Sequence, residues 1–247
     1  MRLDVFFTPN QVKPPDTAGR LVIIVDVLRA STTVATALGN GAKTVIPLEG
    51  PDEVISRSKE FARSQTLLAG EQKMHPITGF DLGNSPQTFT PEVVGGKTIL
   101  ITTTNGTRAL LGVQGARDIV IASYVNFTAV LAMMKVAASS NTDIAIICAG
   151  EEGSFTLEDS ACAGRYVRAI PKRATVAVND AAAASVLIEK KYGDNIAKVF
   201  KESTHGQALE SAGFGDDLAA AAEVDSYPVV PIWQDRQITK LGPERER

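Results

Sequence analysis

Residues 21–33 read LVIIVDVLRASTT, and this stretch decides the expected fold. It opens with five consecutive apolar residues, mostly β-branched, which is typical of a strand buried on both faces. Asp26, Arg29 and three hydroxyl residues follow, and the next residues have the apolar spacing of a helix. A buried strand that leads through a short polar turn into a helix predicts a parallel sheet covered by helices. Open sheets of this kind bind ligands at the carboxyl ends of their strands, so Asp26 and Arg29 become candidate site residues.

The polar residues of this turn have two interpretations. Backbone N–H groups at a helix start attract anions, so the turn and its acid could form a phosphate site. Alternatively, the hydroxyls only cap the helix, and the turn carries no chemistry. The stretch alone leaves both interpretations open.

Composition excludes several classes of partner. The chain has 247 residues, 44% of them hydrophobic, which is ample for a sizeable core. The net charge is −3, and the absence of dense Lys and Arg runs argues against nucleic acid as the main partner. No apolar run reaches the roughly 18 residues of a membrane span, and no signal peptide is evident, so we expect a cytoplasmic protein. Two cysteines and two histidines make a disulfide framework or a structural zinc site improbable.

A unit of strand, polar loop and helix recurs along the chain. Further strands are expected at residues 2–7, 43–47, 66–69, 97–101, 118–123 and 143–148. This recurrence predicts an α/β fold with a mostly parallel sheet flanked by helices. The largely helical residues 178–226 would form a C-terminal helical lobe, or the second half of the chain would form a second α/β subdomain. We expect residues 1–247 to act as a single functional unit, which could divide into two lobes near residue 125.

Three of the expected strand ends carry acids, cations and hydroxyls. Asp26 and Arg29 lie in the first, residues 102–108 form the second, and residues 150–159 form the third. Because parallel strand ends meet at one edge of a sheet, these loops could converge. Arginine pairs with phosphate or carboxylate, and carboxylates bind Mg²⁺. Together they supply what phosphoryl transfer or hydrolysis needs, although each loop could also be a cap, a turn or a solvated surface.

Two further features could join this site. The long loop at residues 70–86 is glycine-rich and contains Glu71, Lys73 and Asn84, although it could also be a structural Ω-type loop. His205 stands between helical segments, where it could transfer a proton or could make only a structural hydrogen bond. Cys148 ends a buried strand and is interpreted as a core residue. The signatures of P-loop, dinucleotide-binding and serine-hydrolase sites are absent from the sequence.

With these loops assembled, the sequence resembles the 2-phosphosulfolactate phosphatase family over nearly the whole chain. The resemblance rests on five strings in order, namely DVLRASTTVATAL (26–38), GFDLGNSP (79–86), TTTNGTRAL (102–110), CAGEEGSFTLEDSACAG (148–164) and HGQALESAGFGDDLAAAAEVD (205–225), the last followed by VVPIW. It implies a Mg²⁺-dependent acid phosphatase that converts (R)-2-phospho-3-sulfolactate to 3-sulfolactate and phosphate, a step toward coenzyme M in methanogens. The phosphate, sulfonate and carboxylate of that substrate suit a site with several cations.

The loops and the resemblance together identify three groups of candidate residues. The candidates for catalysis are Asp26, Glu71 and His205. The candidates for binding Mg²⁺ are Asp26, Glu71, Glu158 and Asp159. The candidates for binding substrate are Arg29, Thr32, Lys73, Asn84, Asn105, Thr107 and Arg108. Whether Asp26 or a metal-activated water attacks phosphorus stays open at this point.

Two alternatives to this function stay open as well. The same site could serve a phosphatase of another small phosphorylated hydroxy acid. From a different class, the chain could be a non-catalytic protein that binds a small anion. In each case we expect a small anionic ligand, neither nucleic acid nor membrane as partner, and a homodimer as one possible assembly.

Overall fold

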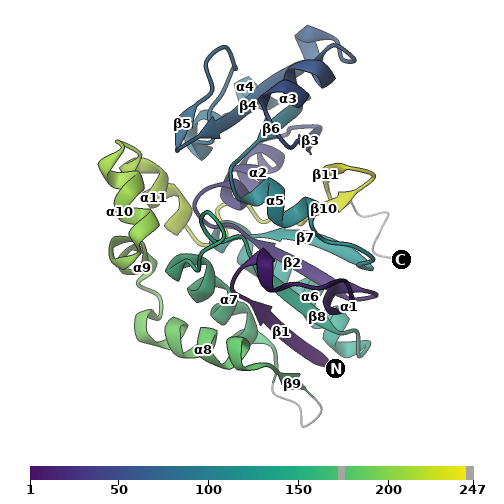
Figure 1. The fold of residues 1–247 in the computed structure, drawn as a ribbon, viewed down its shortest axis with the longest axis vertical. Helices are drawn as coiled ribbons and strands as arrows, with labels where there is room; N and C mark the ends of the chain where they lie inside the picture. Colours follow the sequence, from purple (N-terminus) through teal and green to yellow (C-terminus); the bar gives the residue numbers. More distant parts are fainter. Residues whose placement is uncertain (172–175, 243–247) are drawn as a thin grey trace.

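The computed structural model describes residues 1–171 and 176–242, apart from the side chain of Arg108. Within these residues the strands form one sheet (Figure 1), in the spatial order β5 (His75–Pro76), β4 (Thr66–Gln72), β6 (Thr98–Thr102), β3 (Thr44–Pro47), β11 (Gln237–Lys240), β10 (Pro231–Gln234), β7 (Asp118–Ala122), β2 (Leu21–Val25), β8 (Ile144–Cys148), β1 (Arg2–Phe6) and β9 (Ala177–Val178). Most neighbouring pairs are parallel. The predicted α/β class with a mostly parallel sheet is confirmed.

Strand β2 lies in the interior of the sheet. It pairs in parallel with β7 on one side and with β8 on the other. All five of its residues are buried, because alternate side chains enter the two opposite cores. Ile23 packs in the core with helices α6 (Phe127–Ser139) and α7 (Leu157–Ala169), whereas Ile24 packs in the core with α2 (Ala30–Gly39). This two-sided burial explains the unbroken apolar run that precedes Asp26.

The C-terminal hairpin of β10 and β11 joins the two halves of the sheet. Strand β10 pairs antiparallel with β7, through Ile232 and Val120. Strand β11 pairs antiparallel with β3, through Ile238 and Val45. Nothing in the sequence indicates that this hairpin lies inside the sheet. The expected division near residue 125 stays a prediction.

Helices cover the sheet and form the C-terminal lobe (Figure 1). Each of β2, β3, β6, β7 and β8 leads toward a helix, as the recurring unit predicts. Besides α2, α6 and α7, the helices are α1 (Pro14–Thr17), α3 (Pro51–Ser58), α4 (Pro91–Val94), α5 (Gly106–Leu111), α8 (Asp180–Tyr192), α9 (Ile196–Glu202), α10 (Thr204–Ser211) and α11 (Gly215–Ala222). Short 3₁₀ turns occur at Pro9–Gln11, Arg63–Gln65, Pro86–Thr88 and Tyr124–Asn126. Among the described helices, none is long and apolar enough to cross a bilayer.

Two element boundaries differ from the sequence expectation in ways that affect the site. Strand β4 continues to Gln72, because β6 pairs with its Gly70 and β5 pairs with its Glu71. Glu71 therefore lies on a strand rather than in a loop. Helix α7 begins at Leu157, so Glu158 and Asp159 lie in its first turn rather than in the loop after β8.

Candidate active site

A polar pocket opens at the carboxyl ends of β2, β4 and β6, at the sheet edge that the sequence indicates. Its volume is about 140 Å³, which suits a small molecule better than a drug-sized ligand. The described residues that line it are Asp26, Leu28, Arg29, Glu71, Lys73, Met74, Asn84, Thr103, Thr104, Asn105, Glu151, Glu152 and His205. The structure thus brings together all three predicted catalytic residues.

Asp26 directly follows β2 and presents its carboxylate to the pocket. Its Oδ1 accepts a hydrogen bond from the backbone N–H of Ala30, at 3.1 Å, whereas Oδ2 has no hydrogen-bond partner among the described residues. Burial raises the pKa of Asp26 to about 6, although the charge of His205 acts in the opposite direction. The side chain is therefore ionised at neutral pH and keeps one oxygen for a metal, a proton or a phosphorus atom.

Glu71 is held rigidly by three hydrogen bonds. Its Oε1 accepts from the backbone N–H of Thr104, at 2.8 Å, and from the Thr104 hydroxyl, at 2.9 Å. Its Oε2 accepts from the backbone N–H of Met74, at 2.9 Å. Glu71 therefore joins strand β4 to the loop after β6, and its carboxylate reaches the pocket in a fixed orientation.

His205 enters the pocket from the first turn of α10. Its Nδ1 lies 3.0 Å from Oε1 of Glu158, and its Nε2 lies 4.0 Å from Oε1 of Glu151. Burial lowers the pKa of His205, but the hydrogen bond to Glu158 and the charges of Glu158, Glu151 and Asp26 outweigh it and raise the pKa to about 9. The imidazole is therefore protonated at neutral pH, as an anion site or a proton donor requires.

Glu158 and Asp159 are buried and are not among the described residues that line the pocket. Glu158 holds His205 through Oε1, and its buried Oε2 has no hydrogen-bond partner in the described part of the structure. Asp159 accepts the backbone N–H groups of Val27, at 2.8 Å, and Gly150, at 3.1 Å. Burial, together with the charge of Glu158, raises the pKa of Asp159 well above its usual range. Asp159 thereby ties the loop after β2 to the loop after β8.

Arg29 lines the pocket with a guanidinium that is already partly engaged. Its Nη1 donates to Oδ2 of Asp217 at 2.8 Å, and its Nη2 donates to the Met74 carbonyl at 2.6 Å. The guanidinium carbon lies 4.3 Å from the centre of the Phe214 ring. Arg29 thus joins the turn after β2 to the β4–β5 hairpin and to α11.

The other predicted substrate-binding residues divide between the pocket and its surroundings. Lys73 is exposed and forms no ion pair with any described residue. Asn84 is buried at the pocket, and its Oδ1 has no hydrogen-bond partner within the described residues. Asn105 accepts the backbone N–H of Glu152 at 2.9 Å. The side chain of Arg108 lies outside the described part of the structure, so its contact with substrate stays a prediction.

Thr32 and Thr107 are not among the described residues that line the polar pocket. The Thr32 hydroxyl donates to the Val27 carbonyl at 2.7 Å and lies 2.8 Å from the Ser123 hydroxyl. The Thr107 hydroxyl lies 3.2 Å from that of Thr103. These hydroxyls stabilise the turns that present Asp26 and the loop after β6.

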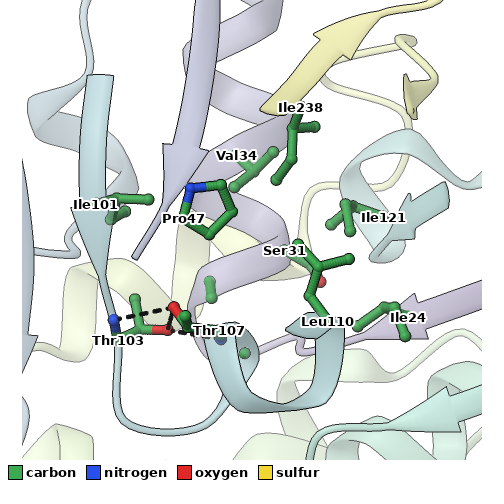
Figure 2. A pocket seen from close by; sticks show the side chains of 12 residues that line it. Ile24, Ser31, Val34, Pro47, Ile101, Thr103, Thr107, Leu110, Ile121 and Ile238 are labelled. Atoms are coloured by element: carbon green, nitrogen blue, oxygen red, sulfur yellow. Dashed lines mark hydrogen bonds between the residues drawn. The ribbon is translucent and has the colours of Figure 1, made fainter. Parts of the chain in front are cut away.

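A second cavity lies between α2, α5 and the sheet (Figure 2). Its volume of about 30 Å³ is the size of a single water molecule, and its lining is mostly aliphatic. Figure 2 shows Thr103 and Thr107 turned toward each other at its border. We place the candidate site in the polar pocket, because this cavity offers neither the room nor the charges that a phosphorylated ligand needs.

The described side chains of the polar pocket include more acids than bases. The four acids are Asp26, Glu71, Glu151 and Glu152, and the three bases are Arg29, Lys73 and His205. Asp217 further offsets the charge of Arg29. No group of three or more Asp, Glu, His or Cys side chains among the described residues forms a ready-made metal cage. Mg²⁺ commonly binds through one or two carboxylates together with substrate phosphate and water, so Asp26 and Glu71 are sufficient in number.

Sequence reasoning did not single out three residues that shape the site. Glu151 approaches His205, Thr104 holds Glu71, and Asp217 holds Arg29. Glu151 belongs to the loop at residues 150–159, which the sequence indicates as part of the site without distinguishing Glu151 within it. Asp217 follows another acid in the first turn of α11, a pattern that usually reflects only the helix dipole. The sequence carries no signal that Asp217 is buried or that it pairs with a distant residue, so Asp217 could not be predicted.

Comparisons with known proteins agree on one family. A family model described as 2-phosphosulpholactate phosphatase matches residues 6–236. A protein of Caldanaerobacter subterraneus subsp. tengcongensis, named "Probable 2-phosphosulfolactate phosphatase", is 38% identical over 231 residues, which are 94% of this chain and 95% of the relative. A protein of Symbiobacterium thermophilum with the same name is 40% identical over 235 residues, covering 92% of this chain and 98% of the relative. A third, from a Synechococcus species, is 37% identical over 94% of this chain and 95% of its own length.

Proposed function

Since the chain belongs to the 2-phosphosulfolactate phosphatase family, a family of phosphoric monoester hydrolases, we propose that it hydrolyses (R)-2-phospho-3-sulfolactate to 3-sulfolactate and phosphate. One observation carries the proposal beyond the comparisons. Asp26, whose Oδ2 accepts no hydrogen bond from the described residues, and His205, protonated at neutral pH, line the same small pocket. A nucleophile or base together with a proton donor is what hydrolysis of a phosphate ester requires.

The proposed substrate matches the cations of the pocket. It carries phosphate, sulfonate and carboxylate on three carbons, so it needs several separate cationic contacts. Arg29, Lys73 and His205 supply three such contacts from the turn after β2, the β4–β5 hairpin and α10. The buried Asn84 adds an amide whose oxygen has no hydrogen-bond partner in the described part of the chain. This oxygen can accept a hydrogen bond from a hydroxyl or a bound water.

We further propose that the enzyme uses Mg²⁺. The excess of acids over bases among the described lining residues would repel a polyanionic substrate, and a divalent cation removes that repulsion. Asp26 and Glu71 fit the metal because both supply oxygen ligands at the pocket and Oδ2 of Asp26 has no hydrogen-bond partner among the described residues. When bound, Mg²⁺ would neutralise charge on the phosphoryl group. We assign Glu158 and Asp159 to positioning instead, because they hold His205 and two backbone amides.

In this proposal each residue has a defined task. Asp26, ionised above pH of about 6, acts as the nucleophile or as the base toward water. His205 donates a proton to the leaving oxygen, while Glu158 holds its Nδ1 and stabilises the imidazolium. Arg29 and Lys73 hold anionic groups of the substrate. Glu71 keeps the loop after β6 against β4 and so fixes the wall of the pocket.

A panel of small phosphate monoesters with Mg²⁺ tests the proposal. We expect phosphate release to be fastest from 2-phosphosulfolactate and slower from 2-phospholactate, which lacks the sulfonate. Equal rates would favour a phosphatase of broader specificity at the same site. If none of these esters releases phosphate although the protein binds them, the non-catalytic anion-binding alternative is correct.

A second measurement decides how phosphorus is attacked. A trapped phosphoaspartate at Asp26 would show that the carboxylate is the nucleophile. Direct incorporation of ¹⁸O from water into phosphate in a single turnover, without a trapped intermediate, would show that water attacks. A cytoplasmic location, a homodimer and a place in coenzyme M synthesis stay predictions from the sequence.

A further inference from the structure

Arg29 and Asp217 form a buried ion pair between the polar pocket and the C-terminal helical lobe. Arg29 Nη1 lies 2.8 Å from Asp217 Oδ2, and each side chain is only 3% exposed. Arg29 lines the pocket, whereas Asp217 is not among the described lining residues. Burying both charges is costly unless further hydrogen bonds complete the pair.

Three further residues complete this pair. The Met74 carbonyl, on the β4–β5 hairpin, accepts from Arg29 Nη2 at 2.6 Å. The Ser85 hydroxyl, before the 3₁₀ turn at Pro86–Thr88, donates to Oδ1 of Asp217. Phe214, just before α11, places its ring against the guanidinium. The plane of the guanidinium is therefore defined by contacts on its edge and on its face.

This arrangement leaves part of the guanidinium available to a ligand. Arg29 carries five N–H groups, and its Nε has no acceptor among the described residues. The Arg29 side chain, although buried, lines the polar pocket, where a small ligand can reach it. Two neighbouring N–H groups of a fixed guanidinium can hold a phosphate, sulfonate or carboxylate in a bidentate manner.

We propose that Asp217 is a positioning residue for substrate binding, which orients Arg29 so that its remaining N–H groups face an anionic group in the pocket. For the identity of the substrate, this inference rests on the proposed function. Its core claim, that Asp217 sets the anion affinity of Arg29, is independent of turnover. The competing explanation is that the pair only fastens the helical lobe to the sheet.

The test replaces Asp217 by asparagine and compares it with a matched control. Asp217→Asn keeps the shape of the side chain and removes its charge, and Asp216→Asn makes the same change at the exposed neighbour on α11. We expect Asp217→Asn to weaken the binding of inorganic phosphate with Mg²⁺, measured by calorimetry, by about tenfold or more. The KM for the phosphate ester should rise similarly while kcat changes by less than about threefold. Asp216→Asn should leave both values unchanged. Equal phosphate affinities of the two variants would overturn the proposal.

A rescue experiment separates positioning from a purely structural role. Arg29→Ala removes the guanidinium and leaves Asp217 and Phe214 in place to bind a soluble one. We expect methylguanidinium to restore phosphate binding in Arg29→Ala but not in Arg29→Ala/Asp217→Ala. Rescue of both variants, or of neither, would overturn the proposal. Because the double variant removes both buried charges together, it also serves if Asp217→Asn fails to fold.

These measurements separate this inference from the proposed function. If the wild-type protein releases no phosphate from any ester, the proposed phosphatase function fails, but calorimetry with inorganic phosphate still tests Asp217. If turnover is normal and Asp217→Asn binds phosphate as the wild type does, only the role of Asp217 fails.

Discussion

The Nδ1 atom of His205 lies 3.0 Å from Oε1 of Glu158, and the two side chains are 10% and 1% exposed. This buried contact joins α10 of the helical lobe to the first turn of α7. Burial alone would lower the pKa of the histidine, but the hydrogen bond and the charge of Glu158, with help from Glu151 and Asp26, raise it to about 9. The pair therefore maintains a proton at the pocket throughout the neutral range.

The first prediction concerns the alkaline limb of the pH–rate profile. Since His205 acts in its protonated form, activity should be present below pH of about 9 and be lost as the pH rises through that value. Glu158→Gln removes the largest contribution that raises this pKa, so the limb should move toward neutral pH. Glu210→Gln is the matched control, because Glu210 is an exposed acid on α10, the helix that carries His205. An alkaline limb that does not move in Glu158→Gln would exclude His205 as the proton donor.

Asp26→Asn should lose activity and gain stability. We expect kcat to fall by at least about 10³-fold, because asparagine can neither attack phosphorus nor accept a proton. Burial raises the pKa of Asp26 from its usual value near 3.8 to about 6. Folding therefore favours the protonated form of Asp26. The stability that this preference gives the folded protein is fully present below the pKa of the unfolded chain and is lost as the pH rises through about 6. Asparagine stays neutral, so without Mg²⁺ the variant should be more stable than the wild type at neutral pH.

Denaturant unfolding of Asp26→Asn and the wild type checks the stability gain at two pH values. The difference between the two proteins should be smaller near pH 4, where the wild-type carboxyl is protonated, than at neutral pH. Added Mg²⁺ should reduce the difference, because it stabilises the ionised wild-type carboxylate. A variant that is less stable than the wild type at both pH values would contradict the conclusion that burial disfavours the ionised form of Asp26.

The third prediction concerns the metal. Chelation by EDTA should abolish phosphate release, and added Mg²⁺ should restore it, because the acids among the described lining residues would otherwise repel a polyanion. Glu71→Gln should raise the Mg²⁺ concentration that gives half of the maximal activity by about tenfold or more. The reason is that an amide cannot replace a carboxylate that accepts three hydrogen bonds from Thr104 and Met74. Glu60→Gln, at an exposed acid, provides the control. Full activity in EDTA would contradict the role of Mg²⁺.

The catalytic edge of the sheet could be predicted from sequence because it depends on local patterns. A continuous apolar run identified β2, and the side chain after it, Asp26, necessarily lies at a carboxyl edge. Parallel strands end at the same edge of a sheet, which predicted the edge at which Glu71 lies. Five strands separate β4 from β2, so the approach of Glu71 to Asp26 could not be derived from the strand pattern. His205 was found by residue type, since few other side chains in the chain could donate a proton near neutral pH.

Features that depend on rotation about an element or on distant pairing could not be predicted. Thr32 and Arg29 lie in the same turn, but the Thr32 hydroxyl contacts Ser123, whereas Arg29 lines the pocket. The hairpin of β10 and β11 enters the middle of the sheet, where only packing against β7 and β3 defines its place. Asp217 resembles an ordinary acid at a helix start until its burial against Arg29 is known.

The last prediction tests the precision with which Asp26 is held. Gly106, the first residue of α5, has no side chain, and a Cβ there would lie 2.7 Å from Oδ2 of Asp26 and 2.8 Å from the Cβ of Ala30. Gly106→Ala should lower kcat by about 10-fold to 100-fold, because it displaces the oxygen that faces the reacting group. The fold should persist, because alanine favours a helix more than glycine does. Gly50→Ala is the matched control, since a Cβ at Gly50 meets nothing within 4 Å. Normal kcat in a folded Gly106→Ala would show that Oδ2 of Asp26 has no part in the reaction.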